Sequence, residues 1–288
     1  MTLPPPSPPV LLGITTRNRA QILGKAITSA LAQDYPNLRV AVVDDASTDE
    51  TTALRAQFPD VHWLRHVTVQ GLMANRNELM QRAGFSYFVS LDDDAWFMQT
   101  DEITLAIDRL EAKPATAGIA FDILSPDRSI PVERGPARSA SMFIGCGHVL
   151  RLSAVREVGW YELSPGTYGS EEKDLSLRLA DLGYPIELLP GVHVWHDKAW
   201  QDRDWFPLHR SGVCNELVMT LRRCPLPDLL LVLPLKVASF GWYWLRAPRF
   251  LAAGLAGLGD ALRTFARTWA TRAPVRRATF WQFIRAKN

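Results

Sequence analysis

Three consecutive aspartates, Asp92, Asp93 and Asp94, follow directly on the mostly apolar run 85–91. The run is typical of a buried strand, so the three carboxylates lie where that strand ends. Adjacent carboxylates repel one another unless a cation lies among them, and hard divalent cations bind oxygen ligands. A solvated acidic turn is the alternative interpretation. We expect a divalent metal site, because open α/β sheets bind ligands at the carboxyl ends of their strands.

Strand and helix patterns alternate between residues 10 and 91 and predict the elements that position these carboxylates. The expected strands cover residues 10–15, 38–43, 61–64 and 85–91, and the expected helices cover 19–33, a segment from Ser47 onward, and 71–83. Such alternation predicts an α/β fold with a mainly parallel sheet covered by helices. Right-handed crossovers place the carboxyl ends of these strands on one edge. Asp44 and Asp45, which follow the second strand, are therefore expected beside Asp92.

The second half of the chain has a less regular pattern. It predicts helices at 102–113 and 171–182, a strand at 117–123, a loop at 125–138, and two short strands at 186–189 and 192–195. The composition, 47% hydrophobic and 22% charged, is that of a globular protein with a core large enough for two lobes. The three cysteines match no zinc pattern and predict no disulfide framework, which favours a reducing compartment.

The segment 226–288 differs from the rest of the chain in charge and hydropathy. It carries 10 Lys or Arg against 2 acidic residues, whereas the rest of the chain carries 22 against 28. Pro234 and Lys236 interrupt its apolar runs, which are too short for the roughly 20 residues of a spanning helix. We expect helices at a membrane interface, because arginines and aromatic residues flank these runs. A helical cap on the core is the second interpretation and a spanning helix the third.

Several common catalytic motifs are absent, including Gly-x-Gly-x-x-Gly after the first strand, the P-loop, and Gly-x-Ser-x-Gly. The chain instead resembles the family 2 glycosyltransferases with the GT-A fold. The matching stretches are TTRNR at 15–19, VVDDASTDET at 42–51, NRN at 75–77, LDDDA at 91–95 and GSEEKDLSLR at 169–178. They occur in the family's order over about residues 10–200, and the combination of the second and fourth stretches is specific to the family.

The resemblance implies a nucleotide-sugar site at the carboxyl edge of the sheet. Asp92 and Asp94 match the motif that holds a divalent cofactor, Mn²⁺ or Mg²⁺, on the donor diphosphate. The residues implied to contact the donor are Thr15, Arg17, Asp44, Asp45, Arg76 and Asp93. Residues 75–77 are expected to begin a helix whose dipole favours phosphate, with an ion pair as the equal alternative for Arg76. A solvated surface position is the alternative for Arg17.

Glu171 and Glu172 match the acidic pair that supplies the catalytic base in the family. The pair is usually Glu-Asp, so this chain departs from the pattern by one methylene. Glu172 matches the base, which takes the proton of the acceptor hydroxyl, and Glu171 is the second choice. The alternative is that both residues only favour a helix N-terminus. Asp174 and Arg178 are expected to pair along this helix.

Two further stretches match the family near its acceptor and its metal. Gly145, Cys146 and Gly147 resemble a small-residue turn beside the acceptor, where glycine permits close backbone approach and the cysteine packs. Some relatives use a histidine from the segment 192–197 as a further metal ligand. Spacing three on a strand places His193 and His196 on opposite faces, so at most one of them serves. We choose His196; a histidine that is merely exposed or satisfied in the core is the alternative.

These inferences predict an inverting, metal-dependent glycosyltransferase that moves a sugar from a nucleotide-diphosphate donor to a glycan or lipid-linked acceptor hydroxyl. Cell-surface polysaccharide or glycolipid assembly is the expected setting. The alternatives are a sugar nucleotidyltransferase and a non-catalytic nucleotide-binding scaffold at a membrane. We expect no nucleic-acid partner, because the basic residues lie among apolar runs and the body is acidic.

The expected protein is cytoplasmic and peripheral at the inner face of the membrane. The expected domains are a disordered proline-rich leader at 1–9, a nucleotide-sugar-binding half at 10–125, an acceptor-binding and catalytic half at 126–225, and a basic helical extension at 226–288. The leader lacks the features of a signal peptide.

Overall fold

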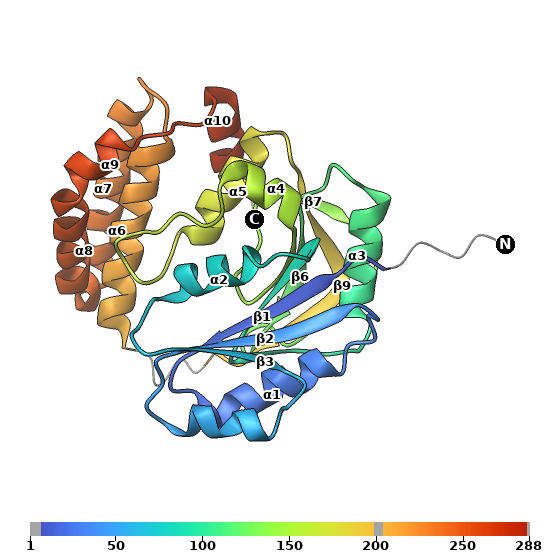
Figure 1. Ribbon diagram of the computed structural model, residues 1–288. Helices are drawn as coiled ribbons and strands as arrows, with labels where there is room; N and C mark the ends of the chain where they lie inside the picture. Colours follow the sequence, from blue (N-terminus) through green and yellow to red (C-terminus); the bar gives the residue numbers. More distant parts are fainter. Residues whose placement is uncertain (1–6, 199–203, 287–288) are drawn as a thin grey trace. The chain divides into compact units, whose positions relative to one another are not determined.

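The computed structural model describes residues 7–198 and 204–286 (Figure 1). These residues form two compact units. The first comprises the described part of Met1–Trp160 together with Gly183–Lys198, and the second comprises Tyr161–Leu182 and the described residues from 204 onward. Residues 1–6 of the expected leader lie outside the described residues. Its last residues are described, and the carbonyl oxygen of Pro8 accepts a hydrogen bond from the Tyr35 hydroxyl at 2.8 Å.

In the first unit, the described strands form one sheet in the order β3-β2-β1-β4-β8-β6-β9-β5, with β7 paired to β9. Their bounds are β1 Val10–Thr16, β2 Leu38–Asp45, β3 His62–His66, β4 Tyr87–Asp92, β5 Ala95–Phe97, β6 Gly118–Leu124, β7 Arg138–Ala140, β8 Gly147–Arg151 and β9 Ile186–His196. The strands β1 to β4 pair in parallel, which confirms the prediction for this part of the sheet. Their apolar centres are buried, as is typical of parallel strands covered on both faces.

The register of β1 brings both acidic clusters to one edge of the sheet. Thr16 pairs with Asp44 on β2, and Thr15 pairs with Asp92 on β4. Both carboxylates therefore lie beside the last residues of the same central strand. The predicted convergence of the two clusters follows directly from this register.

Helices cover both faces of the sheet. Those of the first unit are α1 Ala20–Leu31, the 3-10 helix η1 Glu50–Ala56, α2 Leu72–Met80, α3 Glu102–Ala112 and α4 Leu152–Val158. Helices α1 and α3 pack on the core face that contains Leu12. Helix α2 covers the opposite face, where a Cβ added to Gly13 would lie 2.6 Å from the Leu79 side chain. Figure 1 shows α1 and α2 on opposite sides of β1 and β2.

Two local predictions are wrong. No helix begins at Ser47, because the Ser47 amide donates to Asp44 Oδ1 at 2.8 Å and its hydroxyl accepts from the Asn18 amide at 2.9 Å. Both bonds close the turn after β2, and η1 starts three residues later. The second half has one long strand, β9, in place of the two expected ones. Gly191, at φ +84°, bends this strand without ending it.

The sheet beyond β4 is mixed. Strand β8 lies antiparallel between β4 and β6, while β9 runs parallel to β6 and antiparallel to β5. The parallel half of the sheet therefore continues into a mixed half, in which β8 brings a chain segment distant in sequence to the side of β4.

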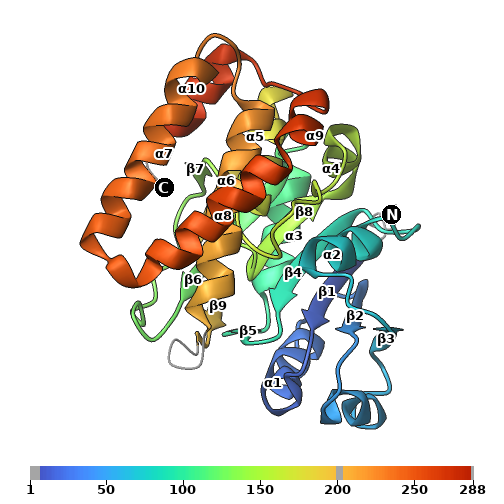
Figure 2. The ribbon, with the colours of Figure 1, turned by 90° about the vertical axis from the view of Figure 1, so that its left-hand side faces the viewer.

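The second unit is helical. Its helices are α5 Glu171–Asp181, α6 Trp205–Arg223, α7 Leu229–Arg246, η2 Pro248–Phe250, α8 Leu251–Arg263, α9 Phe265–Ala270 and α10 Arg277–Arg285. Helices α7 and α8 form a hairpin against α6 (Figure 2), around a core that contains Val213, Leu217 and Trp244. Among the described residues, every helix is too short or too polar to cross a membrane.

Candidate functional site

The three aspartates after β4 bind three different kinds of partner. Asp92 Oδ1 accepts a hydrogen bond from Arg76 Nη2 at 2.8 Å. Asp93 Oδ2 accepts one from the Thr16 hydroxyl at 2.8 Å. Asp94 is buried, and its Oδ1 lies 3.1 Å from His196 Nε2. The side chains of this cluster are therefore held in place by residues from β1, α2 and β9.

Arg76 is the buried cation of this edge. Only 2% of its surface is exposed, and a second bond runs from its Nη2 to the carbonyl oxygen of Gly145 at 3.0 Å. Helix α2 begins at Leu72, so Arg76 lies in mid-helix, and the prediction that residues 75–77 begin the helix is wrong. The ion pair of Arg76 is buried and not at the surface, and contact of Arg76 with phosphate stays a prediction. Arg76 thereby fixes the turn at Gly145 next to Asp92.

Three residues that could hold a metal ion lie at the same place. One ligand atom each of Asp92, Cys146 and His196 fall within 4.8 Å of one another. Burial raises the pKa of the Cys146 thiol well above its usual range, and the Asp92 and Asp94 carboxylates raise it further. A neutral thiol is a poor ligand for Mg²⁺ or Mn²⁺, which prefer oxygen. Asp94, in contact with His196, is the better third ligand.

The two ring nitrogens of His196 have different surroundings. The side chain is buried, and no described residue forms a hydrogen bond with its Nδ1. Its Nε2 faces the Asp94 carboxylate, so a cation held by both residues would take the place of this direct contact. His193 is directed elsewhere, with its Nε2 3.8 Å from Asp122 Oδ2. The residues present fit a divalent cation.

Electrostatics sets Asp93 apart from its neighbours. Burial raises its pKa to about 7, and the charges of Asp94 and Asp92 act in the same direction, against the Thr16 hydrogen bond and Arg19. Without a cation the cluster therefore holds a proton near neutral pH. A divalent ion would replace that proton with positive charge.

The cluster after β2 has a different set of partners. Asp45 accepts the backbone amides of Gln70 at 2.7 Å and Gly71 at 2.9 Å, one on each carboxylate oxygen. Asp44 accepts the Ser47 amide and lies 3.6 Å from the Arg65 guanidinium. These carboxylates shape the loops that surround the edge.

The remaining residues predicted for donor and acceptor lie at the same edge. Thr15 is half-buried at the end of β1, and Arg17 is exposed just beyond it. Cys146 is buried in the core, and a Cβ added to Gly147 would lie 2.8 Å from Ile123. The structure thus gathers the first-unit candidates, with the turn 145–147 held against Asp92 through Arg76.

Glu171 and Glu172 are the first two residues of α5 in the second unit. Glu171 is buried and Glu172 is half-buried. The predicted pair of Asp174 with Arg178 is confirmed, with 2.7 Å between Oδ2 and Nε. The same Asp174 carboxylate also binds Arg223 of α6 at 2.6 Å.

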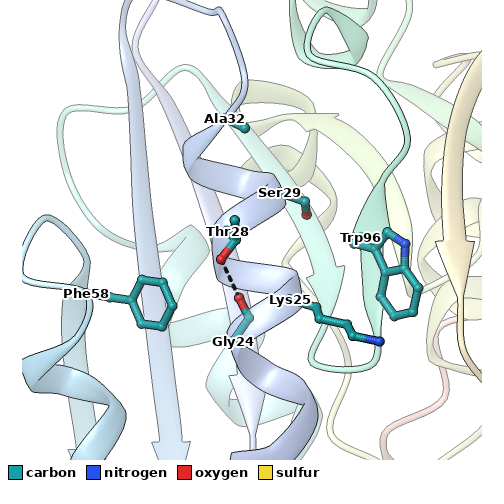
Figure 3. A pocket seen from close by; sticks show the side chains of 7 residues that line it. All are labelled: Gly24, Lys25, Thr28, Ser29, Ala32, Phe58 and Trp96. Carbon is teal, nitrogen blue, oxygen red and sulfur yellow. Dashed lines mark hydrogen bonds between the residues drawn. The ribbon is translucent and has the colours of Figure 1, made fainter.

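A groove of about 620 Å³ crosses the outer surface of α1 between Phe58 and Trp96 (Figure 3). Lys25 extends over the Trp96 ring, 5.0 Å from its centroid. The Thr28 hydroxyl in its floor already donates to the Gly24 carbonyl at 2.8 Å. None of the residues that line it is a predicted site residue, and the groove offers little polar chemistry.

Sequence analysis missed Asn215 and Glu216, which bind the turn before Glu171. The Asn215 side chain bonds to the backbone of Gly166 and Tyr168, and Glu216 accepts from Ser170. A signal was present, because this polar pair interrupts the apolar face of a helix. A buried amide or carboxylate at such a place needs a partner.

Comparison with known proteins adds a family and several relatives. The model of the family "Glycosyl transferase family 2" matches residues 12–155. The chain is 29% identical over 231 residues to a pre-mycofactocin glycosyltransferase of Mycobacterium tuberculosis, covering 70% of this chain and 46% of that protein. It is 33% identical over 94 residues to the putative colanic acid biosynthesis glycosyl transferase WcaA of Escherichia coli, covering 31% of this chain and 33% of the other. The chain thus spans less than half the length of these relatives.

Two solved structures resemble the whole fold. The mannosyltransferase PcManGT from Pyrobaculum calidifontis, in complex with GDP-Man and Mn²⁺, matches with a TM-score of 0.60 at 19% identity, over 98% of this chain and 88% of that one. S. aureus TarS 1–349 in complex with UDP-GlcNAc matches with a TM-score of 0.63 at 15% identity, over 92% and 84%. At these identities the likeness establishes the fold.

Proposed function

Because the chain belongs to glycosyl transferase family 2, we propose that it transfers a sugar from a nucleotide-diphosphate donor to an acceptor hydroxyl, with inversion. The family resemblance and the GT-A fold predicted from the sequence are confirmed. The observation that carries the proposal is the meeting of Asp92, Asp94 and His196 at the strand-end edge. The relative named for colanic acid biosynthesis supports a role in cell-surface polysaccharide or glycolipid assembly.

In this proposal Asp92, Asp94 and His196 hold Mn²⁺ or Mg²⁺. The ion, when bound, neutralises the charge that builds on the leaving diphosphate. Arg76 already neutralises part of the negative charge of Asp92. One divalent ion would balance the negative charge that remains on the cluster. The Mn²⁺ in the PcManGT structure supports the choice of metal by analogy of fold.

The donor site uses the loops around this metal set. Thr15, Arg17, Asp44, Asp45, Arg76 and Asp93 are the residues proposed to contact or shape it. Asp44 and Asp45 are buried and tied to backbone amides, so we assign them to holding loops against the base and ribose. Arg17 is exposed and cationic, and it is the residue proposed to meet the nucleotide directly.

The acceptor hydroxyl loses its proton to a carboxylate of α5. Glu172 is the proposed base, because it is half-buried and keeps access to solvent, whereas Glu171 is 2% exposed. A helix N-terminus stabilises the carboxylate form, which is the form a base requires. Gly145, Cys146 and Gly147 form the proposed acceptor turn, with Cys146 as a packed neutral thiol.

The helical extension is proposed to dock on the inner face of a membrane, where a lipid-linked acceptor resides. Large apolar side chains on α7 and α8 are more than a third exposed, namely Leu230, Leu231, Leu235, Trp242, Leu245, Leu255 and Leu262. Arg246 lies 4.4 Å above the Trp242 ring, a pairing suited to the headgroup region. The surrounding arginines favour anionic lipid.

Calorimetric titration with UDP, dTDP and GDP, each with Mn²⁺ and with EDTA, tests the donor site. We expect one nucleotide to bind, and only with metal. Glu172→Gln should then leave this binding unchanged while slowing transfer from the matching nucleotide sugar. Failure of all three nucleotides to bind would overturn the proposal, and normal turnover by the variant would place the base elsewhere.

Flotation with vesicles of phosphatidylglycerol and phosphatidylcholine tests the membrane surface. The double variant Trp242→Ser/Leu245→Ser should float less than the wild-type protein. Ile130→Ser is the matched control, because Ile130 is an exposed apolar residue of the first unit. Equal flotation of all three proteins would contradict membrane docking through α7.

A further inference from the structure

The turn before Glu171 has a backbone conformation that one of its residues, Ser170, disfavours. Gly169 and Ser170 both have positive φ, +101° and +70°. For serine the left-handed region costs roughly 1–2 kcal/mol relative to a right-handed conformation. Such conformations persist where the surrounding structure holds them, and they cluster at functional sites. Helix α6 supplies the holding groups here.

Asn215 holds the first half of the turn. It is fully buried, and its Oδ1 accepts the Gly166 amide at 2.8 Å. Its Nδ2 donates to the carbonyl oxygens of Gly166 and Tyr168, each at 3.1 Å. A Cβ added to Gly166 would lie 2.7 Å from the Asn215 Oδ1 atom, so the two residues are fitted to each other.

Glu216 holds the second half of the turn. Its carboxylate accepts the Ser170 hydroxyl at 2.8 Å and Lys173 Nζ at 2.6 Å. It also binds the ammonium group of Lys236, which projects from α7. Burial opposes the charged form, but the two lysines outweigh it and lower the pKa of Glu216 to about 2. At neutral pH the Glu216 carboxylate is therefore ionised, and it is bound to Ser170 and to the two lysines.

We infer that Asn215 and Glu216 are positioning residues that fix the turn 166–170 and thereby orient Glu171 and Glu172. The inference rests on the proposed role of that pair as proton acceptor. The body of α5 is held separately, since Asp174 binds Arg223 of α6 at 2.6 Å. Loss of Glu216 therefore loosens the turn while α5 stays docked. Through Lys236 the same carboxylate also connects the turn to the apolar helix α7.

Two variants, Asn215→Ala and Glu216→Ala, test this inference in the full chain. Each should lower kcat by about 10- to 100-fold, because small displacements of a catalytic group have effects of that size. Metal-dependent nucleotide binding should be unchanged. The matched control is Asp260→Asn, which removes the ion pair between Arg210 of α6 and α8 and does not touch the turn. The control should keep the wild-type kcat.

Ser170 separates positioning from general stability. Ser170→Ala loses the bond to Glu216 and keeps the unfavourable left-handed conformation, whereas Ser170→Gly loses the bond but adopts that conformation freely. We expect Ser170→Gly to keep the higher kcat of the two, and Ser170→Gly to restore part of the activity of Glu216→Ala. Equal kcat in both serine variants, with no restoration, would overturn the inference.

Hydrogen exchange of the backbone amides at 166–172 measures the rigidity of the turn and needs no substrate. Exchange there should quicken in Asn215→Ala and Glu216→Ala and slow again in Glu216→Ala/Ser170→Gly. Activity is followed as nucleoside diphosphate released from UDP-GlcNAc and GDP-mannose. A wild-type protein that neither binds nucleotide nor turns over would overturn the proposed function. An active wild type whose turn and kcat are unaffected by these variants would overturn only this inference.

Discussion

Asp44 and Asp45 are the last residues of β2, at the sheet edge where Asp92 ends β4 and Asp93 and Asp94 follow it, yet the two clusters have different partners. Asp45 accepts two consecutive backbone amides, and Asp44 accepts one. Backbone donors are fixed in place and cannot leave, so both oxygens of Asp45 are already satisfied, while the second oxygen of Asp44 faces the side chains of Thr52 and Arg65. Asp44 and Asp45 act as loop anchors.

The cluster after β4 faces side chains instead. Asp92 meets the guanidinium of Arg76, and Asp94 meets the imidazole of His196. An imidazole can turn from a carboxylate partner to a shared cation, and a carboxylate has lone pairs left when one oxygen is paired. Position at the end of a strand therefore does not by itself make a carboxylate suited to bind a metal. The group that each carboxylate already contacts decides whether it is suited.

The largest expected effect on nucleotide binding alone belongs to Asp94→Asn. Removing a metal-binding carboxylate should weaken Mn²⁺-dependent nucleotide binding by on the order of 100-fold, since even the partners of metal ligands contribute 10- to 100-fold. Titration calorimetry measures this directly. Asp101→Asn is the control, because Asp101 pairs with the exposed Arg134 at 2.7 Å in the same unit. Unchanged metal-dependent binding in Asp94→Asn would remove Asp94 from the metal set.

Asp92→Asn should give a similar loss of binding together with a loss of stability. The buried Arg76 guanidinium would lose its carboxylate partner, and an unpaired buried charge destabilises by roughly 3–5 kcal/mol. Urea unfolding separates the two effects. A variant as stable as the wild-type protein would show that Arg76 is satisfied without Asp92.

A smaller, pH-dependent effect is expected for Asp93→Asn. Burial raises the pKa of Asp93 to about 7, so the folded protein binds this proton more tightly than the unfolded chain. The resulting stability is full below about pH 4 and is lost as pH rises through 7. In EDTA the variant should therefore gain stability relative to wild type over this window, by on the order of 2 kcal/mol. Urea unfolding at pH 4 and pH 7.5 measures it, and an equal difference at both pH values would contradict it.

The sequence predicts the edge better than it predicts the partners at the edge. Apolar runs that end in aspartates predict, from local pattern alone, that Asp44 and Asp92 lie at strand ends. The strand register, in which Thr16 pairs with Asp44 and Thr15 with Asp92, agrees with this prediction. The helix expected at 71–83 is close to α2, but the expectation that Arg76 lies at a helix start is wrong, because Arg76 lies inside α2. His196 reaches Asp94 only through β9, a long-range strand pairing that periodicity does not specify.

In the second unit, too, the contacts that are local in sequence are predictable and the long-range contacts are not. The acidic pair at Glu171 and the pairing of Asp174 with Arg178 are local in sequence, and both are visible as motif and spacing. Asn215 and Glu216 lie more than 40 residues from the turn they bind, so no local pattern connects them. A polar pair inside the mostly apolar stretch 213–221 indicates that a partner exists but does not identify it.

The smallest expected effect is that of Asp45→Asn, and it tests the comparison most sharply. An asparagine can accept the Gln70 or the Gly71 amide through its oxygen, but its NH₂ group would face the other. One lost hydrogen bond at the start of α2 should destabilise the protein by about 1–2 kcal/mol, seen as a lower urea midpoint. Nucleotide binding with Mn²⁺ should weaken less than 10-fold and keep its metal dependence, with Asp101→Asn unchanged in both assays. A carboxylate that only anchors a loop has no means of removing the metal dependence of nucleotide binding. If Asp45→Asn abolished metal-dependent binding, as we expect of Asp94→Asn, Asp45 would therefore take part in metal binding together with the second cluster.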